Sequence, residues 1–214
     1  MLFNNTKYWN KFYKKHTLII KPSNFSQFIK KEFLKKKKIK NILEIGCGNG
    51  RDTFYFSKYA TKIVSIDNSQ QAIIKSKNNE RMQKNIIFLK KNILSRFNVV
   101  VKNFDLIYAR FFLHTINSIE EDIFLNLLKK ISNKKTIVAL EFRTTKDKLF
   151  KKGKKISKNE SITDHYRRFV EVSNFKNKLK KLNFKIIYFK QSVNLSNFKN
   201  DNPHLCRIVF KNVK

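Results

Sequence analysis

The sequence predicts an α/β fold: a three-layer sandwich in which helices cover a seven-stranded, mostly parallel sheet with an antiparallel last strand. From residue 41 to about residue 142, short β-branched or aromatic runs alternate with stretches of helical period, which is typical of βαβ units. Three of the four glycines follow the first of these runs within five residues, as expected where a strand turns sharply into a helix. The final two runs have no helical stretch between them, so they depart from the βαβ pattern.

Each predicted strand is a short apolar run bounded by polar or turn residues. The runs are Asn41 to Ile45, Ile63 to Ile66, Ile86 to Leu89, Phe104 to Tyr108, Thr136 to Phe142, Phe184 to Lys190 and Leu205 to Phe210. A connection of about 14 residues joins the last two.

Two helices are predicted, one before this pattern and one within it. Helical spacing after Pro22-Ser23 predicts an N-terminal helix that covers one sheet edge or a ligand mouth, with the apolar residues Phe25, Phe28, Ile29 and Phe33. Between the fourth and fifth strands, Ser118 and Glu121 are predicted to form a capping box. The apolar face of that helix is predicted to contain Ile119, Ile123, Phe124, Leu127, Leu128 and Ile131.

The final third of the chain is predicted to begin with a long loop. Thr144 to Thr163 is polar, rich in Lys and contains Gly153, and such loops usually serve as lids or are disordered. A helix is predicted next, with Ser173 as N-cap and Asn183 in a left-handed conformation after its end. Its apolar face comprises Phe175, Leu179 and Leu182.

At 214 residues and 25.6 kDa the chain is predicted to be one domain. Residues 1–40 form an N-terminal cap helix, 41–142 a ligand-binding core, and 143–214 a substrate-side lid with the C-terminal strands. We expect a cytoplasmic protein without a membrane span, because neither a bilayer-length apolar run nor a secretory signal is present. Cys47 and Cys206 are expected to be reduced, and no metal site is indicated.

The formal net charge of +33 would attract polyanions such as nucleic acid. Of the 48 basic residues, however, 40 are Lys, whereas Gly and Pro number only 4 and 2. Lys, Asn, Ile and Phe have AT-rich codons, so compositional drift would produce most of this charge without selection for polyanion binding. The runs Lys35 to Lys38 and Lys151 to Lys155 are then expected to be solvated surface, and specific nucleic-acid binding is not expected.

The segment Leu43 to Gly50, which reads Leu-Glu-Ile-Gly-Cys-Gly-Asn-Gly, carries the clearest chemical signal. Its glycines mark positions that cannot carry a side chain, because the backbone turns sharply and passes close beneath a ligand. The third glycine comes one residue too early for the nicotinamide-dinucleotide fingerprint. With Glu44 before the first glycine, the segment resembles the first motif of class I S-adenosylmethionine-dependent methyltransferases.

This resemblance implies a Rossmann-like fold with the cofactor over the glycine turn. Asp67, at the end of the second strand, is expected to accept hydrogen bonds from both ribose hydroxyls, the alternative being a turn or N-cap role before Ser69. Asn92 stands where family members often carry Asp near the adenine amino group. The residues expected to bind S-adenosylmethionine are Trp9, Glu44, Gly46, Cys47, Gly48, Gly50, Asp67, Asn68, Asn92, Ile93 and Tyr108.

The segment after the fourth strand indicates the class of acceptor. Family members that methylate exocyclic amines of bases, or glutamine amides, usually carry an Asn/Asp-Pro-Pro-aromatic element here, and this chain instead has Ala109 to His114. Oxygen or other acceptors are therefore expected, with His114 and Glu141 as candidate general bases. The alternative for His114 is a buried side chain whose ring nitrogens are satisfied by backbone groups.

Arginines are scarce in this chain, so adjacent ones stand out from the Lys background. Arg167 and Arg168 would hold a phosphate or carboxylate bidentately, the alternative being that they pair with surface acids. The full set of expected acceptor-binding residues is Arg110, Arg143, Tyr166, Arg167 and Arg168.

Tyr8 to Tyr13 and Asn202 to His204 resemble a subgroup of bacterial methyltransferases found with capsule and surface-polysaccharide synthesis. The resemblance implies methyl transfer to an oxygen of a small anionic or sugar-containing acceptor, such as a glycan precursor, by in-line displacement that needs no metal. Two alternatives stay open: an RNA methyltransferase that uses the positive surface, and a non-catalytic cofactor-binding subunit. The intact glycine turn and Asp67 disfavour the second alternative.

Overall fold

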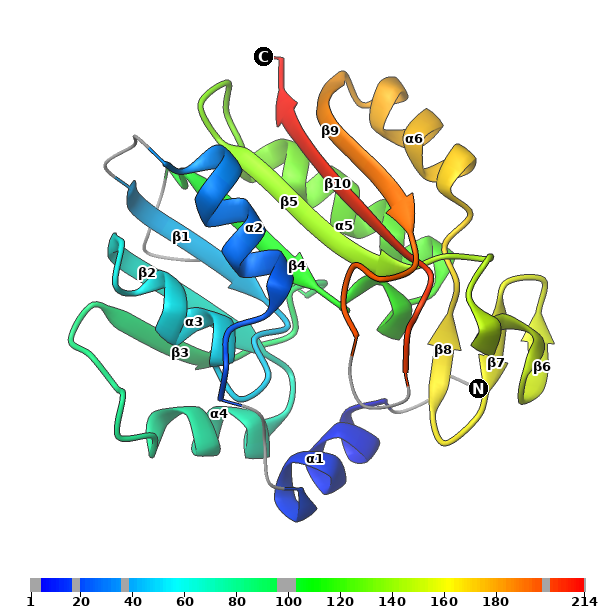
Figure 1. Cartoon of the computed structure of the whole chain (residues 1–214), viewed down its shortest axis with the longest axis horizontal. Coiled ribbons are helices and arrows are strands. Elements are labelled where there is room, and N and C mark those ends of the chain that lie inside the picture. The colour runs from blue at the N-terminus through cyan, green and yellow to red at the C-terminus, as the bar shows by residue number, and fades with distance from the viewer. Residues whose placement is uncertain (1–4, 17–19, 36–38, 96–102, 198–200, 214) are drawn as a thin grey trace. The chain divides into compact units, whose positions relative to one another are not determined.

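The structure is a computed structural model that describes residues 5–16, 20–35, 39–95, 103–197 and 201–213. Seven strands form one sheet in the order β3-β2-β1-β4-β5-β10-β9 (Figure 1), and β10 runs antiparallel to both of its neighbours. The predicted fold class, a Rossmann-like sheet that is mostly parallel with an antiparallel last strand, is confirmed.

The chain falls into two compact units, Met1–Ala109 and Arg110–Lys214. The prediction of a single domain with subdivisions near residues 40 and 142 stays a prediction. In the described ranges, no helix is long and apolar enough to cross a membrane. Cys47 and Cys206 are buried free thiols.

The first unit contains the parallel half of the sheet. Strand β1 pairs in parallel with β2 and β4, and β2 pairs in parallel with β3, so their carboxyl ends share one edge. Apolar residues of β1, such as Ile42 and Leu43, are fully buried. The elements are α1 (Asn5–Lys15), α2 (Asn24–Phe33), β1 (Ile39–Ile45), α3 (Arg51–Phe56), β2 (Ala60–Asp67), α4 (Gln70–Lys77), β3 (Ile86–Lys90) and β4 (Leu106–Arg110).

The predicted N-terminal helix is α2, whose N-cap Ser23 accepts a hydrogen bond from the backbone nitrogen of Ser26. Phe25 and Ile29 are buried as its spacing predicts. Helix α1 was not predicted from the sequence. None of its residues is fully buried, so a burial pattern does not reveal it.

The second unit contains the antiparallel half of the sheet and two long helices. Strand β10 pairs with β5 and β9 on either side, and every residue of β5 is buried. The elements are η1 (Leu113–Thr115), α5 (Ser118–Ile131), β5 (Ile137–Arg143), η2 (Lys148–Lys151), β6 (Lys154–Ser157), β7 (Glu160–Ile162), β8 (Tyr166–Arg168), α6 (Val172–Lys181), β9 (Phe184–Ser192) and β10 (Leu205–Asn212).

Helix α5 lies where it was predicted, but its buried face is different. Ile119 and Ile123 are 72% and 46% exposed, whereas Glu121, Phe124, Leu125 and Leu128 are buried. The capping box is formed by Asn117 and Glu120, one residue earlier than predicted. Phe124 and Leu128 are buried as predicted, whereas Ile119 and Ile123 are not, because the helix turns the charged Glu121 inward.

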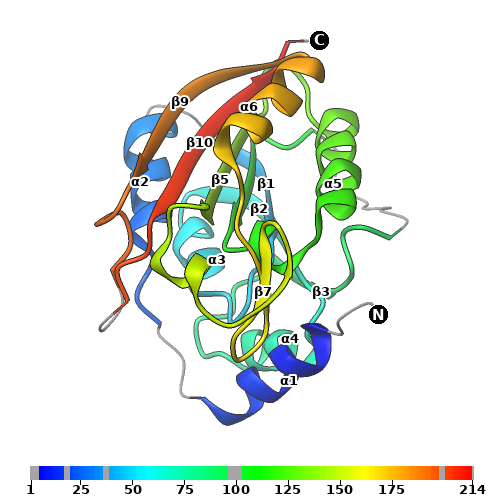
Figure 2. The same cartoon turned by 90° about the vertical axis from the view of Figure 1, so that its right-hand side faces the viewer.

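The segment Thr144 to Thr163 is not the loop that was predicted. Most of it folds into η2, β6 and β7, and these strands form a small antiparallel sheet with β8, labelled in Figure 1 and seen from the side in Figure 2. Gly153 has a φ of 81°, and a Cβ there would lie 2.3 Å from the carbonyl oxygen of Ile162. The single glycine therefore permits a close backbone approach within an otherwise Lys-rich hairpin.

Helix α6 begins two residues earlier than predicted, with Glu171 rather than Ser173 at the N-cap position. Asn183 after its end has a φ of 55°, which confirms the predicted left-handed conformation. Lys35 and Lys151 to Lys155 are exposed as expected, and the rest of the Lys35 to Lys38 run lies outside the described residues.

Candidate active site

The glycine turn connects β1 to α3 in the first unit. Gly46, Gly48 and Gly50 have φ values of 71°, 55° and 75°, in the left-handed region that a residue with a Cβ rarely adopts. The backbone nitrogens of Gly46 and Cys47 donate to the carbonyl oxygen of Ile66 over 2.9 and 3.1 Å. These bonds fix the turn against the carboxyl end of the neighbouring strand β2.

Asp67, the last residue of β2, lies at this turn. Its Oδ2 accepts a hydrogen bond from the backbone nitrogen of Gly48 over 2.9 Å, and its Oδ1 accepts one from Ser69 over 2.8 Å. Burial raises the pKa of this carboxyl, while the backbone hydrogen bonds act in the opposite direction. Ser69, rather than Asp67, is the N-cap of α4, so Asp67 does not cap the helix; its bond from the Ser69 nitrogen is the turn contact that was the alternative role.

Glu44 lies beneath the turn and is 3% exposed. Its Oε2 accepts hydrogen bonds from the hydroxyls of Thr53 and Ser65. Burial, followed by the charge of Asp52, raises the pKa of Glu44 well above its usual value. The side chain is therefore held within the core by neutral donors.

The remaining predicted cofactor residues of this unit occupy different environments. Asn68 donates to the hydroxyl of Thr6 over 2.8 Å, and Ile93 is buried. Asn92 is exposed, and its Oδ1 accepts a hydrogen bond from the backbone nitrogen of Leu94 over 3.0 Å. Trp9 lies on α1.

Tyr108, a predicted cofactor residue, is fully buried. Its hydroxyl donates to Oδ2 of Asp52 over 2.9 Å, and its ring stacks on Phe25 at 5.1 Å between centroids. Because every side of the ring is covered, Tyr108 serves as packing in this structure.

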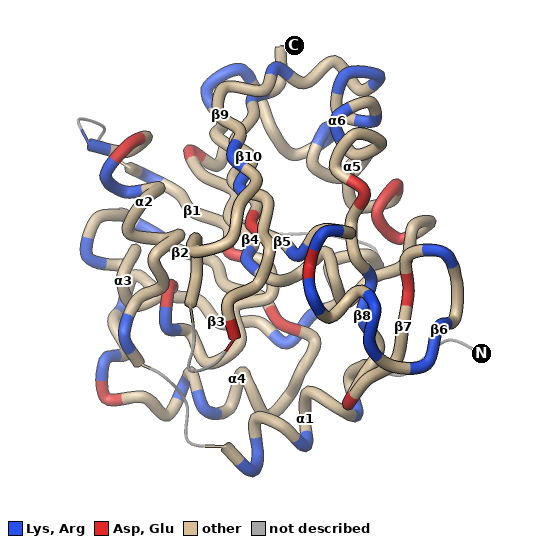
Figure 3. Tube along the Cα trace, turned by 45° about the vertical axis from the view of Figure 1, so that its right-hand side comes forward, with Lys and Arg blue, Asp and Glu red and all other residues tan. Residues whose placement is uncertain are grey.

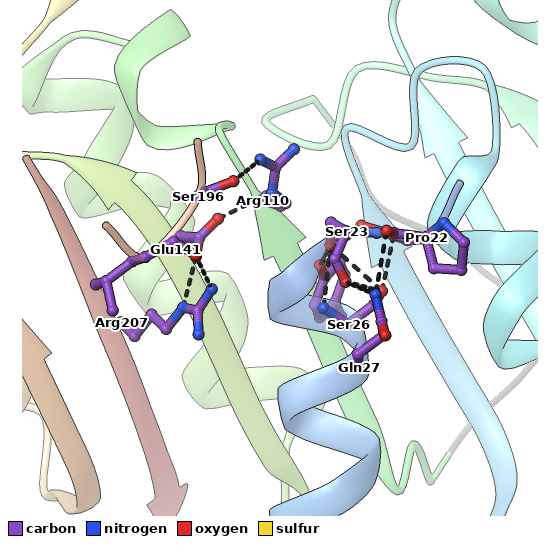
Figure 4. Close-up of polar contacts among 11 residues, drawn as sticks. Pro22, Ser23, Ser26, Gln27, Arg110, Glu141, Ser196 and Arg207 are labelled. Atoms are coloured by element: carbon purple, nitrogen blue, oxygen red, sulfur yellow. Dashed lines mark hydrogen bonds and ion pairs between the residues drawn. The ribbon is translucent and has the colours of Figure 1, made fainter. Parts of the chain in front are cut away.

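Asp52 is a buried carboxylate that the sequence analysis missed. Ser23 donates to it through both its backbone nitrogen and its hydroxyl, each over 2.7 Å, and Ser26 donates over 2.8 Å. Figure 4 shows Ser23 and Ser26 together at the start of α2. Asp52 thus ties α2 to α3, the helix that follows the glycine turn. Its place directly after that turn was the only available signal.

In the second unit, His114 lies in the short turn η1 and is 5% exposed. Among the described residues, its Nδ1 has no hydrogen-bond partner. Burial lowers the pKa of His114 well below its usual value, and the charge of Arg143 lowers it further. The ring of His165 lies 6.5 Å away between centroids.

Glu141, near the carboxyl end of β5, is held between two guanidinium groups (Figure 4). Arg110 Nε and Arg207 Nε lie 2.9 and 2.6 Å from its two carboxylate oxygens. The same arginines bind the connection between β9 and β10, at the hydroxyl of Ser196 over 2.6 Å and the carbonyl of Leu195 over 2.7 Å. Arg207 was missed because it lies within a strand with no motif around it.

Arg143 is paired with Asp147 over 2.9 Å and with Asp201. Close to it, Phe111 has a φ of 56°, and the guanidinium groups of Arg110 and Arg143 lie 4.1 and 5.8 Å from the centre of its ring. An aromatic residue in the left-handed region is strained, and such strain is concentrated at functional sites.

Arg167 and Arg168 do not form one fork. They are consecutive in β8, so their side chains point to opposite faces. Arg168 donates to Oε2 of Glu121 over 2.5 Å, and Arg167 donates to Oδ1 of the exposed Asp164 over 2.5 Å. The buried Tyr166 shares its face with Arg168.

A family model described as a methyltransferase domain matches residues 36–179. No curated protein matches the sequence. Among solved structures, an S-adenosylmethionine-dependent methyltransferase from Clostridium acetobutylicum has a TM-score of 0.68 at 13% identity, with 97% of each chain covered. One from Anabaena variabilis has a TM-score of 0.69 at 17% identity, covering 97% of this chain and 93% of the other.

The N-methyltransferase NodS from Bradyrhizobium japonicum, in complex with S-adenosyl-L-homocysteine, has a TM-score of 0.64 at 14% identity. The alignment covers 88% of this chain and 86% of that one. At such identities these structures show a common fold. Because the family model spans more than half of the sequence, the chain belongs to the methyltransferase domain family and is an enzyme that uses S-adenosylmethionine as its cofactor.

Proposed function

We propose that this methyltransferase transfers its methyl group to an oxygen of a small anionic or sugar-containing acceptor in surface-polysaccharide synthesis. The observation that carries the proposal is the buried His114 with an unpartnered Nδ1 among the described residues. The absence of an Asn/Asp-Pro-Pro-aromatic element after β4 supports oxygen over the amines that such elements serve.

The residues of the glycine turn fit the cofactor. Three glycines at alternate positions, each with positive φ, bring the backbone close to any ligand above them, and Asp67 provides a carboxylate beside that backbone. We propose that Asp67 holds the ribose and that Asn92 and Ile93 border the adenine. When bound, S-adenosylmethionine supplies an electrophilic methyl group on a sulfonium sulfur.

His114 is the preferred general base. Its lowered pKa keeps the imidazole neutral near pH 7, so a ring nitrogen has a lone pair that can take the proton of an acceptor hydroxyl. The same surroundings disfavour the imidazolium ion. An anionic acceptor beside the ring would offset the charge of Arg143 and raise the pKa of His114, which supports an acceptor that carries negative charge.

Glu141 suits a positioning role better than a base. Both of its oxygens accept hydrogen bonds from arginines. To take up a proton as a base, Glu141 would have to break one of these charge-assisted bonds. We propose that Glu141 orients Arg110 and Arg207 so that they hold the connection at Leu195 and Ser196.

Of the predicted acceptor-binding arginines, Arg143 and Arg167 are the better candidates. Asp201 and Asp164, which pair with them, are about half exposed, with side-chain values of 47% and 54%. Such partners can exchange for an acceptor anion at little desolvation cost. Arg168 is 6% exposed and paired with the buried Glu121, which favours a structural role.

The first test is incubation of the protein with cell extract and methyl-labelled S-adenosylmethionine, followed by size fractionation. Label in small, anionic or glycan fractions supports the proposal. Label in RNA would favour the RNA methyltransferase alternative, for which the +33 charge is the only feature. Figure 3 shows Lys and Arg distributed over many helices and strands rather than along one element, as compositional drift would produce.

RNA affinity at physiological ionic strength separates these alternatives further. Non-specific complexes have dissociation constants of ~10⁻⁴ to 10⁻⁶ M under such conditions. Tight, sequence-selective RNA binding would overturn the proposal.

A further inference from the structure

A cavity of about 290 Å³ lies in the first unit, along helix α3. Arg51, Phe54 and Tyr55 line it from one face of the helix, since they occupy positions i, i+3 and i+4. The rest of the lining is Pro22, Lys58 and the segment from Glu80 to Gln83 that precedes β3. None of these residues is expected to bind S-adenosylmethionine, so the cavity is separate from the predicted cofactor site.

The lining of this cavity is basic. Among the described residues it contains Arg51, Lys58 and Arg81 against the single acid Glu80. Two of these basic residues are arginines, in a chain that has eight arginines among its 48 basic residues. Compositional drift accounts for abundant lysine but not for two arginines in one cavity. The positive charge of this wall therefore has a more specific cause than that of the surface as a whole.

The guanidinium group of Arg81 is fixed in place by three contacts. Its Nε donates to Oδ1 of Asn79 over 3.2 Å, and its Nη1 donates to the carbonyl oxygen of Ile20 over 3.2 Å. The guanidinium carbon lies 4.7 Å from the centre of the Phe54 ring. Two hydrogen bonds and an aromatic face thus set the orientation of the planar group before any ligand binds.

The third nitrogen of Arg81 is different. Its Nη2 is buried and has no hydrogen-bond partner among the described residues. A buried donor without an acceptor costs free energy, and a charged oxygen is the strongest acceptor that a guanidinium nitrogen can be offered. An anion in the cavity would supply that acceptor to a group that is already oriented, so little entropy would be lost on binding.

The remaining wall suits a flat ring with hydroxyl groups. Tyr55 is half-buried and Met82 is 41% exposed, and both present apolar surface to the cavity. A thioether packs well against aromatic rings. Glu80 would repel a second anionic group, but its carboxylate can accept hydrogen bonds from sugar hydroxyls. The wall therefore matches a ligand with one anionic group, a flat ring and neutral hydroxyls.

We propose that this cavity is a second ligand site, which binds a phosphate monoester that carries a flat ring, as in a nucleoside monophosphate. The phosphate lies at Arg81, and the base lies against Tyr55 and Met82. The volume of the cavity is close to the lower end of the range, roughly 300 to 1,000 Å³, in which proteins bind small molecules.

Calorimetry with uridine monophosphate tests the proposal, at physiological ionic strength and on protein saturated with S-adenosylhomocysteine. Uridine monophosphate should bind, and ribose 5-phosphate and inorganic phosphate should bind at least about tenfold more weakly, because they lack the stacking base. Equal binding of inorganic phosphate would overturn the assignment of a ring-bearing ligand. Binding that is lost when S-adenosylhomocysteine is present would place the nucleotide in the cofactor site and overturn the second site.

A pair of variants separates the cavity from the general positive charge of the surface. Arg81→Gln should weaken binding of uridine monophosphate about tenfold, the effect of a charge-assisted hydrogen bond. Lys84→Gln is the matched control, because it removes the same charge from an exposed position just beyond the lining. It should bind within about twofold of the unaltered protein. Equal losses in the two variants would show that only surface charge attracts the nucleotide.

Lys58→Ala provides a test that does not depend on Arg81, whose side chain also holds Asn79 and Ile20. Lys58 is exposed, so its truncation should leave the urea midpoint unchanged while it weakens binding of uridine monophosphate about threefold. Affinity that is unaltered in both Lys58→Ala and Arg81→Gln, or no binding of uridine monophosphate at millimolar concentration, would overturn the proposal.

Discussion

Arg168 and Glu121 form a buried ion pair, with 2.5 Å between Nη2 and Oε2 and side chains that are 6% and 3% exposed. Arg168→Met should therefore lower the free energy of unfolding by about 3 kcal/mol, because it leaves a buried carboxylate with one cationic partner fewer. Urea unfolding measures this loss. Glu121→Leu in the same chain should recover part of it, whereas an unchanged urea midpoint in Arg168→Met would contradict the structural role.

Arg167→Lys provides the contrasting case on the opposite face of β8. The point charge is kept and the planar fork is lost, so the acceptor's KM should rise about fivefold while cofactor affinity and unfolding free energy stay unchanged. Steady-state kinetics with the identified acceptor check this result. Wild-type kinetics would show that Arg167 only pairs with Asp164.

Asp67→Ala should weaken cofactor binding at least tenfold, about 1.4 kcal/mol, through the loss of charge-assisted hydrogen bonds. Calorimetry measures the change. Asp105→Ala is the control, because Asp105 also accepts a backbone hydrogen bond, from Lys40 over 2.7 Å, but lies at the amino ends of the strands. Equal affinity in the two variants would remove Asp67 from the cofactor site.

The free energy of unfolding should decrease as the pH is lowered from about 6.5 to 4. Burial, followed by the charge of Arg167, lowers the pKa of His165 from 6.5 to about 4. Between these two pH values His165 is protonated in the unfolded chain but neutral in the folded protein, so protonation favours unfolding. At 1.36 kcal/mol per unit, this histidine accounts for about 3 kcal/mol, and His114 acts in the same direction.

Urea unfolding at pH 7.5 and at pH 5 measures this dependence. His165→Gln should make it shallower. The same slope in His165→Gln as in the unaltered protein would contradict the assignment.

The two candidate bases can be separated by turnover. His114→Asn should lower kcat by roughly 10²- to 10⁴-fold, the usual contribution of a general base. Glu141→Gln should lower stability and alter KM but leave the pH dependence of kcat unchanged, because Glu141 acts through Arg110 and Arg207. If the decrease of kcat at low pH disappears in Glu141→Gln rather than in His114→Asn, the two roles are reversed.

The sequence predicts those parts of the fold whose signal is local. Strands β1 to β5 carry their own apolar runs, and the glycine turn requires left-handed backbone at Gly46, Gly48 and Gly50. Asn183 is also local, since its place after a helical period indicates its conformation.

Features that depend on distant partners could not be predicted. Glu121 faces inward because Arg168 and Lys178, far along the chain, meet it there. The separation of Arg167 from Arg168 follows from the strand β8, which forms only by pairing with β7 in a segment that looks like a loop. The burial of Asp52 could not be predicted because its hydrogen-bond donors, Ser23 and Ser26, come from the start of another helix.

The backbone strain at Phe111, next to Arg110 and Arg143, lowers the stability of the protein. A left-handed conformation costs an L-residue with a Cβ about 1 to 2 kcal/mol, and the other non-glycine residues with positive φ in the described ranges are asparagines, which tolerate it better. A glycine at position 111 would adopt the same backbone without strain but would leave no flat ring beside the two guanidinium groups. The protein therefore has a lower thermal stability in exchange for the position of this ring. Phe111→Gly should raise the melting temperature and lower the catalytic activity.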